Sequence, residues 1–130
     1  MLLLLSGVLQ AQTIENRIDS VISKLEIIES NGDSTQVGDD GYSWGILQIR
    51  PIYVQEVNES YASTFKHIDA MSVAKSRGIA HLYLLKGCEL YKIKNGIYPP
   101  DRIIARMHNA GMYNWQNPKA DSYEAKFLKL

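Results

Sequence analysis

The sequence predicts a single, mainly α-helical domain with a cleft and little or no sheet. The chain has 130 residues, which is enough for one hydrophobic core. Apolar residues recur at helical spacing in several long segments, and Asn-Gly or Ala-Gly pairs follow three of them as stop signals. The expected helices span residues 13–30, 69–95, 99–110 and 121–129.

The composition excludes some classes of protein. Hydrophobic residues make up 45% and charged residues 22% of the chain, as in soluble globular domains. Lys plus Arg and Asp plus Glu each number 14, so the formal net charge is zero, which argues against a nucleic-acid-binding protein. Cys88 is the only cysteine, so no internal disulfide is possible, and its helical spacing from Leu85 indicates a core position.

Residues 1–12 form an uncharged, apolar segment that is too short to span a bilayer. With small or polar residues near Ala11, the segment is similar to the core and cleavage region of a secretory signal peptide, although the basic n-region is missing. We therefore expect a periplasmic or extracellular protein without stable membrane insertion, whose domain comprises residues 13–130. The alternative is an apolar arm packed on the domain.

The helix expected at residues 13–30 has the clearest pattern. Thr13 is suited to the N-cap, Glu15 to the positive end of the helix dipole, and Asn31-Gly32 to the stop. Its predicted core face consists of Ile14, Ile18, Val21, Ile22, Leu25 and Ile28.

The middle of the chain is less regular. Residues 31–43 are rich in turn formers and predict a loop, and residues 46–49 fit either a short strand or a buried helical turn. Pro51 predicts the start of a short helix over residues 51–57, followed by a polar stretch over residues 58–68.

Three further helices are expected. Asp69 is predicted to open a long one that ends at Asn95-Gly96, with Gly78 allowing close packing. Its predicted buried stripe is Met71, Ala74, Ile79, Leu82, Leu85, Leu90 and Ile93. Pro100-Asp101 begins the next helix, and Asp121 is expected to cap the last.

Glu29 is the first candidate for chemistry. It lies at the C-terminal end of an apolar helix, at the edge of the apolar face. Burial and the negative end of a helix dipole both favour the protonated form of a carboxyl group. A protonated carboxyl near neutral pH is what a general acid needs, so Glu29 is a candidate acid. The alternative is an ordinary solvated residue at a helix end.

Three short motifs follow one another in order. They are Glu29-Ser30, the run Gly45-Ile-Leu-Gln48, and the turn His108-Asn-Ala-Gly111. This order resembles that of the bacterial lytic transglycosylases (SLT domains), of the lysozyme-like superfamily. The segment from Ala105 to Gly111, with later residues Trp115, Tyr123 and Lys126, also resembles the end of invertebrate-type (destabilase) lysozymes.

The resemblance implies a lysozyme-like fold and cleavage of the β-1,4 bond between N-acetylmuramic acid and N-acetylglucosamine in peptidoglycan. The partner would be the glycan strand, and neither a cofactor nor a metal would be needed by what is expected to be a monomer. In a lytic transglycosylase Glu29 would act alone, first as acid and then as base. A hydrolytic muramidase would need a second carboxylate, for which Asp39 and Asp40 are candidates. Asp-Asp-Gly is equally suited to a turn without a catalytic role.

The remaining candidates are expected to bind substrate: Ser30, Tyr42, Gln48, His108, Asn109 and Tyr123. Ser30 is equally suited to capping, and Gln48 is expected to donate to a sugar N-acetyl or hydroxyl group. Aromatic side chains that are suited to stacking on sugar rings are Tyr42, Trp44, Tyr113, Trp115 and Tyr123. For Trp44 and Trp115, a core position is favoured over a sugar subsite.

The chain departs from the family patterns in three ways. His108 stands where the transglycosylases usually have Tyr, the separation of Glu29 from Gln48 is one residue longer, and the chain lacks the many cysteines of invertebrate-type lysozymes. Two rival interpretations remain: a wall-binding module that has lost catalysis on the same fold, and a helical interaction domain whose motif matches are chance.

Overall fold

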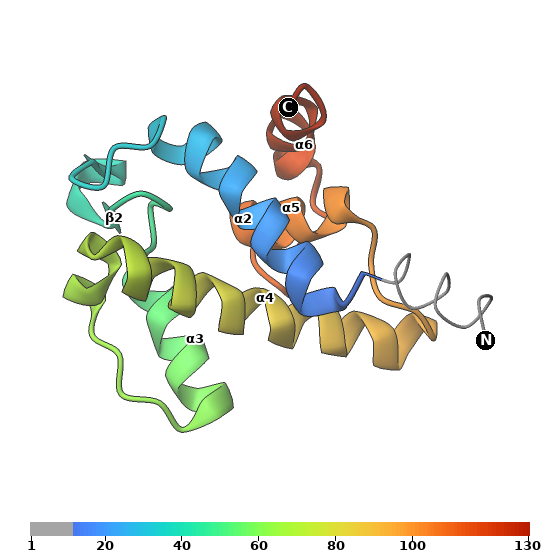
Figure 1. Ribbon diagram of the computed structural model, residues 1–130. Coiled ribbons are helices and arrows are strands. Elements are labelled where there is room, and N and C mark those ends of the chain that lie inside the picture. Colours follow the sequence, from blue (N-terminus) through green and yellow to red (C-terminus); the bar gives the residue numbers. More distant parts are fainter. Residues whose placement is uncertain (1–11) are drawn as a thin grey trace, which may run out of the picture.

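The computed structural model describes residues 12–130, which form a mainly α-helical domain (Figure 1). Within this range there are five α-helices and one sheet of two short strands. The predicted fold class is therefore confirmed. Of the segment interpreted as a signal peptide, residues 1–11 lie outside the described residues. No helix among residues 12–130 is long and apolar enough to cross a membrane.

Helix α2 spans Ile14–Ser30, as the pattern predicts. The Thr13 hydroxyl caps it by accepting a hydrogen bond from the Asn16 amide at 3.1 Å. Asn31 ends it in the left-handed conformation with φ 52°, which asparagine tolerates better than most residues. Ile18 and Leu25 are fully buried, so the apolar face of α2 is part of the core.

The segment predicted as a loop contains a small hairpin. Strand β1 (Val37–Gly38) pairs antiparallel with β2 (Ser43–Trp44) across the 3-10 turn η1 (Asp39–Gly41). The run at 46–49 is neither a strand nor a helix. It is a tight turn closed by two hydrogen bonds between Trp44 and Ile49, each 3.0 Å long.

Helix α3 spans Pro51–Tyr61 and is one turn longer than predicted. Pro51 occupies its first turn, where no amide donor is lost from the helix. The polar stretch that follows is held by Asn58, whose side chain bonds both the amide and the carbonyl of Phe65, at 3.0 Å and 2.8 Å. The polarity of this stretch therefore reflects a structured turn.

The long helix α4 spans Val73–Asn95, and Ser72 caps it. Asp69, predicted to open this helix, instead caps the preceding 3-10 turn η2 (His67–Met71) by accepting from the Lys66 amide at 2.8 Å. The predicted buried stripe is also wrong in part, since Ile93 is 82% exposed. The buried face is Ser76, Ile79, Ala80, Tyr83, Leu84, Gly87 and Cys88. Neighbouring helices pack on this face, which the apolar residues alone do not identify.

Two shorter helices complete the domain. Helix α5 (Asp101–Ala110) is buried at residues 103–108 and at Ala110, and it ends at Gly111, with φ 103°. Helix α6 (Asp121–Leu128) packs on it, with Ala120 and not Asp121 at the N-cap. The Asp121 carboxylate accepts from Arg106 at 2.8 Å, and Arg106 also donates to two carbonyls of the loop between the helices.

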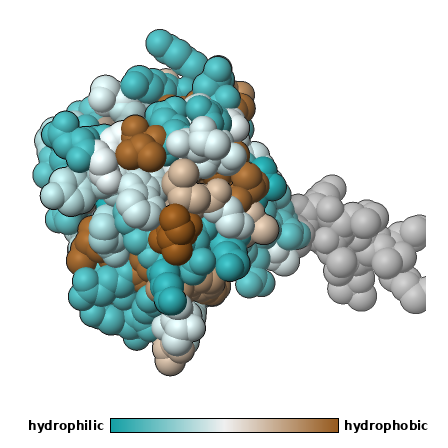
Figure 2. Space-filling model, turned by 90° about the vertical axis from the view of Figure 1, so that its left-hand side faces the viewer, coloured by the Kyte–Doolittle hydropathy of each residue, from teal (hydrophilic) through white to brown (hydrophobic). Residues whose placement is uncertain are grey.

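The helices enclose one core, and α2 lies across α4 and α5 (Figure 1). Glu26, only 4% exposed, joins α2 to α4 through a two-pronged ion pair with Arg77. On the face shown in Figure 2, the hydrophobic side chains form several separate spots in a mostly hydrophilic surface.

Candidate active site

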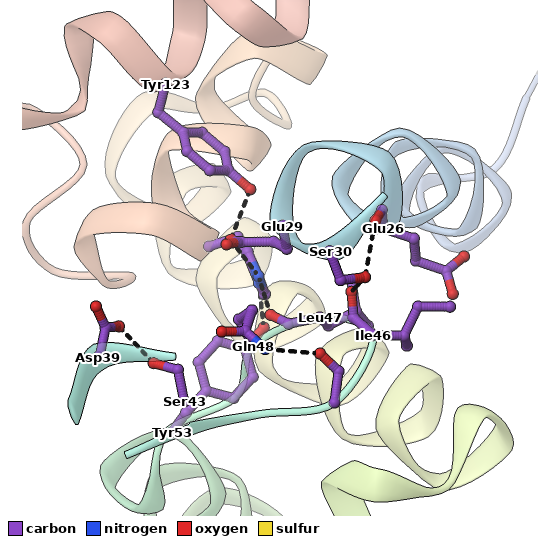
Figure 3. Close-up of polar contacts among 12 residues, drawn as sticks. Glu26, Glu29, Ser30, Asp39, Ser43, Ile46, Leu47, Gln48, Tyr53 and Tyr123 are labelled. Carbon is purple, nitrogen blue, oxygen red and sulfur yellow. Dashed lines mark hydrogen bonds and ion pairs between the residues drawn. The ribbon is translucent and has the colours of Figure 1, made fainter. Parts of the chain in front are cut away.

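Glu29 is the penultimate residue of α2, and its side chain is 20% exposed. The Tyr123 hydroxyl of α6 donates to Glu29 Oε2 at 2.9 Å (Figure 3). Nε2 of His108 lies 3.2 Å from the same oxygen. Among residues 12–130 no hydrogen bond reaches Oε1. One oxygen is therefore fixed by the protein and the other remains free to meet a ligand.

Tyr123 is a buried donor to Glu29, 7% exposed, and does not line the cleft. Burial raises the pKa of Tyr123, and the nearby Glu29 charge and their hydrogen bond raise it further. The hydroxyl therefore stays protonated at any pH the folded protein would ordinarily meet. The structure places Tyr123 behind the carboxylate and not on the sugar-binding side that the sequence suggested.

Glu29 opens into a cleft of about 590 Å³. Five of the candidates from the sequence line it: Glu29, Asp39, Gln48, His108 and Asn109. They come from α2, η1, the turn at 46–49 and α5, so the fold brings Gln48 and Asn109 to the same cleft as Glu29. Ser30, Asp40, Tyr42 and Tyr123 do not line it.

Gln48 supports the loop and is not a free donor. Both hydrogen bonds of its side-chain nitrogen go to backbone carbonyls, those of Gln36 and Gly45, each at 3.0 Å. Its oxygen lies so close to Gly38 that a Cβ there would come within 2.4 Å of it. The expectation that the Gln48 amide donates to a sugar is therefore wrong. Gln48 shapes the cleft wall by joining the hairpin to the turn.

Ser30 and Tyr42 are also corrected by their contacts. The buried Ser30 hydroxyl donates to the carbonyl of Ile46 at 2.7 Å, tying the end of α2 to the turn at 46–49 (Figure 3). Tyr42 is 57% exposed, and the Arg50 guanidinium lies 5.9 Å from its ring centre. Neither residue lines the cleft, although Arg50 does.

The two candidate aspartates, Asp39 and Asp40, differ in their access to the cleft. Asp39 lines the cleft, and its carboxylate accepts a hydrogen bond from the Ser43 hydroxyl (Figure 3). Asp40, its exposed neighbour, does not line the cleft. Both have left-handed backbones, with φ 49° and 54°, as a tight turn requires. The interpretation of Asp-Asp-Gly as turn chemistry is thus supported by geometry, and only Asp39 keeps access to a ligand.

None of the five aromatic residues expected to stack on sugar rings lines this cleft. Trp44 stacks on His67 with ring centres 3.8 Å apart, and Trp115 packs on Tyr91. The aromatic residues that do line the cleft are Tyr53 and Tyr83, which stack on each other at 3.6 Å.

Sequence reasoning also missed several polar residues of the cleft: Gln36, Arg50, Glu56, Asn114 and Lys119. Tyr53 and Glu56 are three residues apart on α3, so they share a helix face. That spacing was the one feature of the sequence that could have grouped these two residues. It is a weak signal, because the sequence does not show which face of α3 meets α2 and α5. Residues 12–130 hold no group of three His, Cys, Asp or Glu side chains that would bind a metal ion.

The arrangement suits proton transfer to a bound substrate. It offers one carboxyl group, with the Tyr123 hydroxyl and the His108 ring beside one of its oxygens, at a cleft of about 590 Å³ that polar side chains line. Comparison of the chain with protein families, curated proteins and solved structures finds no match.

Proposed function

We propose that this protein cleaves the β-1,4 bond between N-acetylmuramic acid and N-acetylglucosamine in peptidoglycan, as a lytic transglycosylase. One observation carries the proposal. The Glu29 carboxyl, held by Tyr123, opens into the cleft that Gln48 and Asn109 also line, and these residues stand in the three motifs whose order resembles that family. Export to the periplasm or the cell exterior, and action as a monomer on glycan strands, are part of the proposal.

The chemistry requires a single acid. Protonated Glu29 gives its proton to the glycosidic oxygen as the bond to the muramic acid breaks. The resulting carboxylate then takes the proton of the substrate's own hydroxyl as that hydroxyl attacks. Glu29 returns to its starting state, and the product has an anhydro-muramic end without a reducing end.

A second candidate is a hydrolytic muramidase that uses Glu29 and Asp39. Its support is that Asp39 lines the same cleft as Glu29. The lytic route is preferred because the Asp39 carboxylate is turned to Ser43 within its own turn. In that role Asp39 stabilises the hairpin, and no hydrogen bond joins it to Glu29.

Replacing Glu29 tests the enzyme assignment. Glu29→Gln keeps the size of the side chain and removes the titrating proton, so wall cleavage should fall about a hundredfold to ten-thousandfold. Turbidity loss of purified peptidoglycan measures the rate, and circular dichroism checks the fold. Glu59→Gln, the same change at an exposed position of α3 outside the cleft, should match the wild type.

Equal activity of Glu29→Gln and wild type would refute the assignment of Glu29 as the general acid. Failure of the folded wild type to cleave any peptidoglycan, while still binding it, would favour the wall-binding module.

The matched pair Asp39→Asn and Asp40→Asn divides the two mechanisms. Asn tolerates the left-handed backbone at both positions, so each variant should fold. We expect both to keep most activity, and mass spectrometry of the products to find anhydro-muramic ends. Loss of activity in Asp39→Asn alone, with reducing ends from the wild type, would assign the hydrolytic mechanism.

A further inference from the structure

His108 is the residue closest to Glu29 whose role the family pattern does not supply. Its side chain is 2% exposed, and both ring nitrogens are engaged. Nε2 lies 3.0 Å from the Leu47 carbonyl oxygen and 3.2 Å from Glu29 Oε2. Nδ1 lies 3.0 Å from the Tyr53 hydroxyl.

The Leu47 carbonyl shows whether the Nε2 nitrogen of His108 carries a hydrogen. A carbonyl oxygen only accepts, so Nε2 carries a hydrogen that points at Leu47 and Glu29. Nδ1 then holds either a lone pair, in neutral imidazole, or a second hydrogen, in imidazolium.

The Tyr53 hydroxyl shows whether Nδ1 carries a hydrogen. Burial raises the pKa of Tyr53 well above its usual range, with smaller increases from Tyr83 and Tyr123, so its hydroxyl keeps its proton. Among residues 12–130 the only hydrogen bond of that hydroxyl is with His108. If Nδ1 also carried a hydrogen, the Tyr53 proton would have no protein acceptor. Stacking on Tyr83 at 3.6 Å holds the Tyr53 ring in place. The hydroxyl therefore donates to Nδ1.

We propose that His108 is a neutral positioning residue, locked by Tyr53 and the Leu47 carbonyl in the Nε2–H tautomer, which donates to Glu29 Oε2 and leaves Oε1 without a hydrogen bond from residues 12–130. An imidazolium in this place would form an ion pair with the Glu29 carboxylate, whereas a neutral ring orients the carboxyl group through one N–H donor alone. The catalytic part of this inference rests on the proposed function. The tautomer does not.

The tautomer is measured directly by ¹⁵N NMR of the full chain with labelled histidine, at neutral pH. His67 and His81 supply the other two ring systems, and His108→Gln identifies the His108 signals by their loss. We expect Nε2 of His108 to be protonated and Nδ1 to be a hydrogen-bonded lone-pair nitrogen. In Tyr53→Phe the Nδ1 signal should move toward that of an unbonded ring nitrogen, and in Tyr113→Phe, at an exposed position, it should not. A doubly protonated ring, or a proton on Nδ1 alone, would overturn the assignment.

Positioning is tested by kinetics on peptidoglycan. His108→Gln retains an N–H donor near Nε2, and His108→Leu removes it, so turnover should be reduced at least tenfold more in Leu than in Gln at a similar Michaelis constant. Equal turnover in the two folded variants would refute positioning. If the wild type cleaves no peptidoglycan but the NMR result holds, the proposed function fails and the tautomer assignment stands.

Discussion

Glu29 receives its hydrogen bond from a residue 94 positions away in the sequence. Its orientation thus depends on the docking of α6, which places Tyr123 above the end of α2 (Figure 3). With the Tyr123 hydroxyl and His108 Nε2 both beside Oε2, the rotation of the carboxyl group is restricted, and under the proposed function Oε1 is held in one direction. Preorganisation of this kind lowers the cost of reaching a transition state.

Removing the Tyr123 hydroxyl should weaken this orientation without removing the acid. In Tyr123→Phe we expect turnover on peptidoglycan to fall about tenfold to a hundredfold, less than in Glu29→Gln, because a hydrogen bond to a charged group is worth about 1.5–3 kcal/mol. Urea unfolding should report a loss of stability of about 1–2 kcal/mol. The control Tyr113→Phe, at a 71% exposed residue, should change neither quantity. A Tyr123→Phe enzyme with unchanged turnover would mean that Glu29 does not need this donor.

At the scale of elements, α4 contains two glycines with opposite surroundings. A Cβ added at Gly78 would meet nothing within 4 Å, whereas one at Gly87 would lie 2.8 Å from Sδ of Met107 and 3.2 Å from Cβ of Met112. Gly87 is therefore the residue that permits close packing of α4 against α5, the role that the sequence suggested for Gly78.

The two glycines make a matched test of this packing. Gly78→Ala should stabilise the protein by about 0.5–1 kcal/mol, because alanine loses less backbone entropy in a helix. Gly87→Ala should destabilise it by about 1–2 kcal/mol, since the Met107 side chain and the Cβ of Met112 must move away from the added methyl group. Thermal unfolding followed by circular dichroism measures both. A stabilised Gly87→Ala variant would show that this interface has room to relax.

The helices that could be predicted are those whose signals are local. Thr13 and Asn31 bound α2, and Asn95-Gly96 and Ala110-Gly111 end α4 and α5, because caps and left-handed residues act within a turn. The burial of α4 was not predictable in the same way. Tyr83 and Gly87 are buried and Ile93 is exposed because α2, α3 and α5 pack where they do.

At the scale of the molecule, the cleft is assembled from segments that the sequence could group only through ordered motifs. Those motifs grouped Glu29, Gln48 and Asn109, which do line one cleft, but they did not predict the contacts that these side chains make. The amide of Gln48 is used by the backbone, and the aromatic residues of the cleft come from α3 and α4. Such contacts depend on side-chain directions in the folded state, for which single-sequence patterns hold no signal.

The same burial that shapes the site makes the whole molecule sensitive to alkali. Burial is the largest cause that raises the pKa of Tyr53, Tyr83 and Tyr123, and it raises the pKa of the Cys88 thiol to about 12. In the unfolded chain tyrosines lose their protons near pH 10 and cysteine somewhat lower, at about 8.5. Folding therefore retains protons that the unfolded chain has released. The stability from these groups is complete below those unfolded values and is lost as pH rises toward the folded ones.

We expect the unfolding free energy to be nearly constant from pH 7 to about pH 8.5, then to fall with a slope of up to about 1.4 kcal/mol per pH unit for each such group. The decline should steepen above about pH 10, where three tyrosines contribute together. Urea titrations at a series of pH values measure the slope. Tyr123→Phe lacks one titrating group, so its decline above pH 10 should be shallower than that of the wild type, whereas Tyr113→Phe should follow the wild type. A slope that is the same in all three proteins would mean that the Tyr123 hydroxyl is not shielded from solvent in the folded protein.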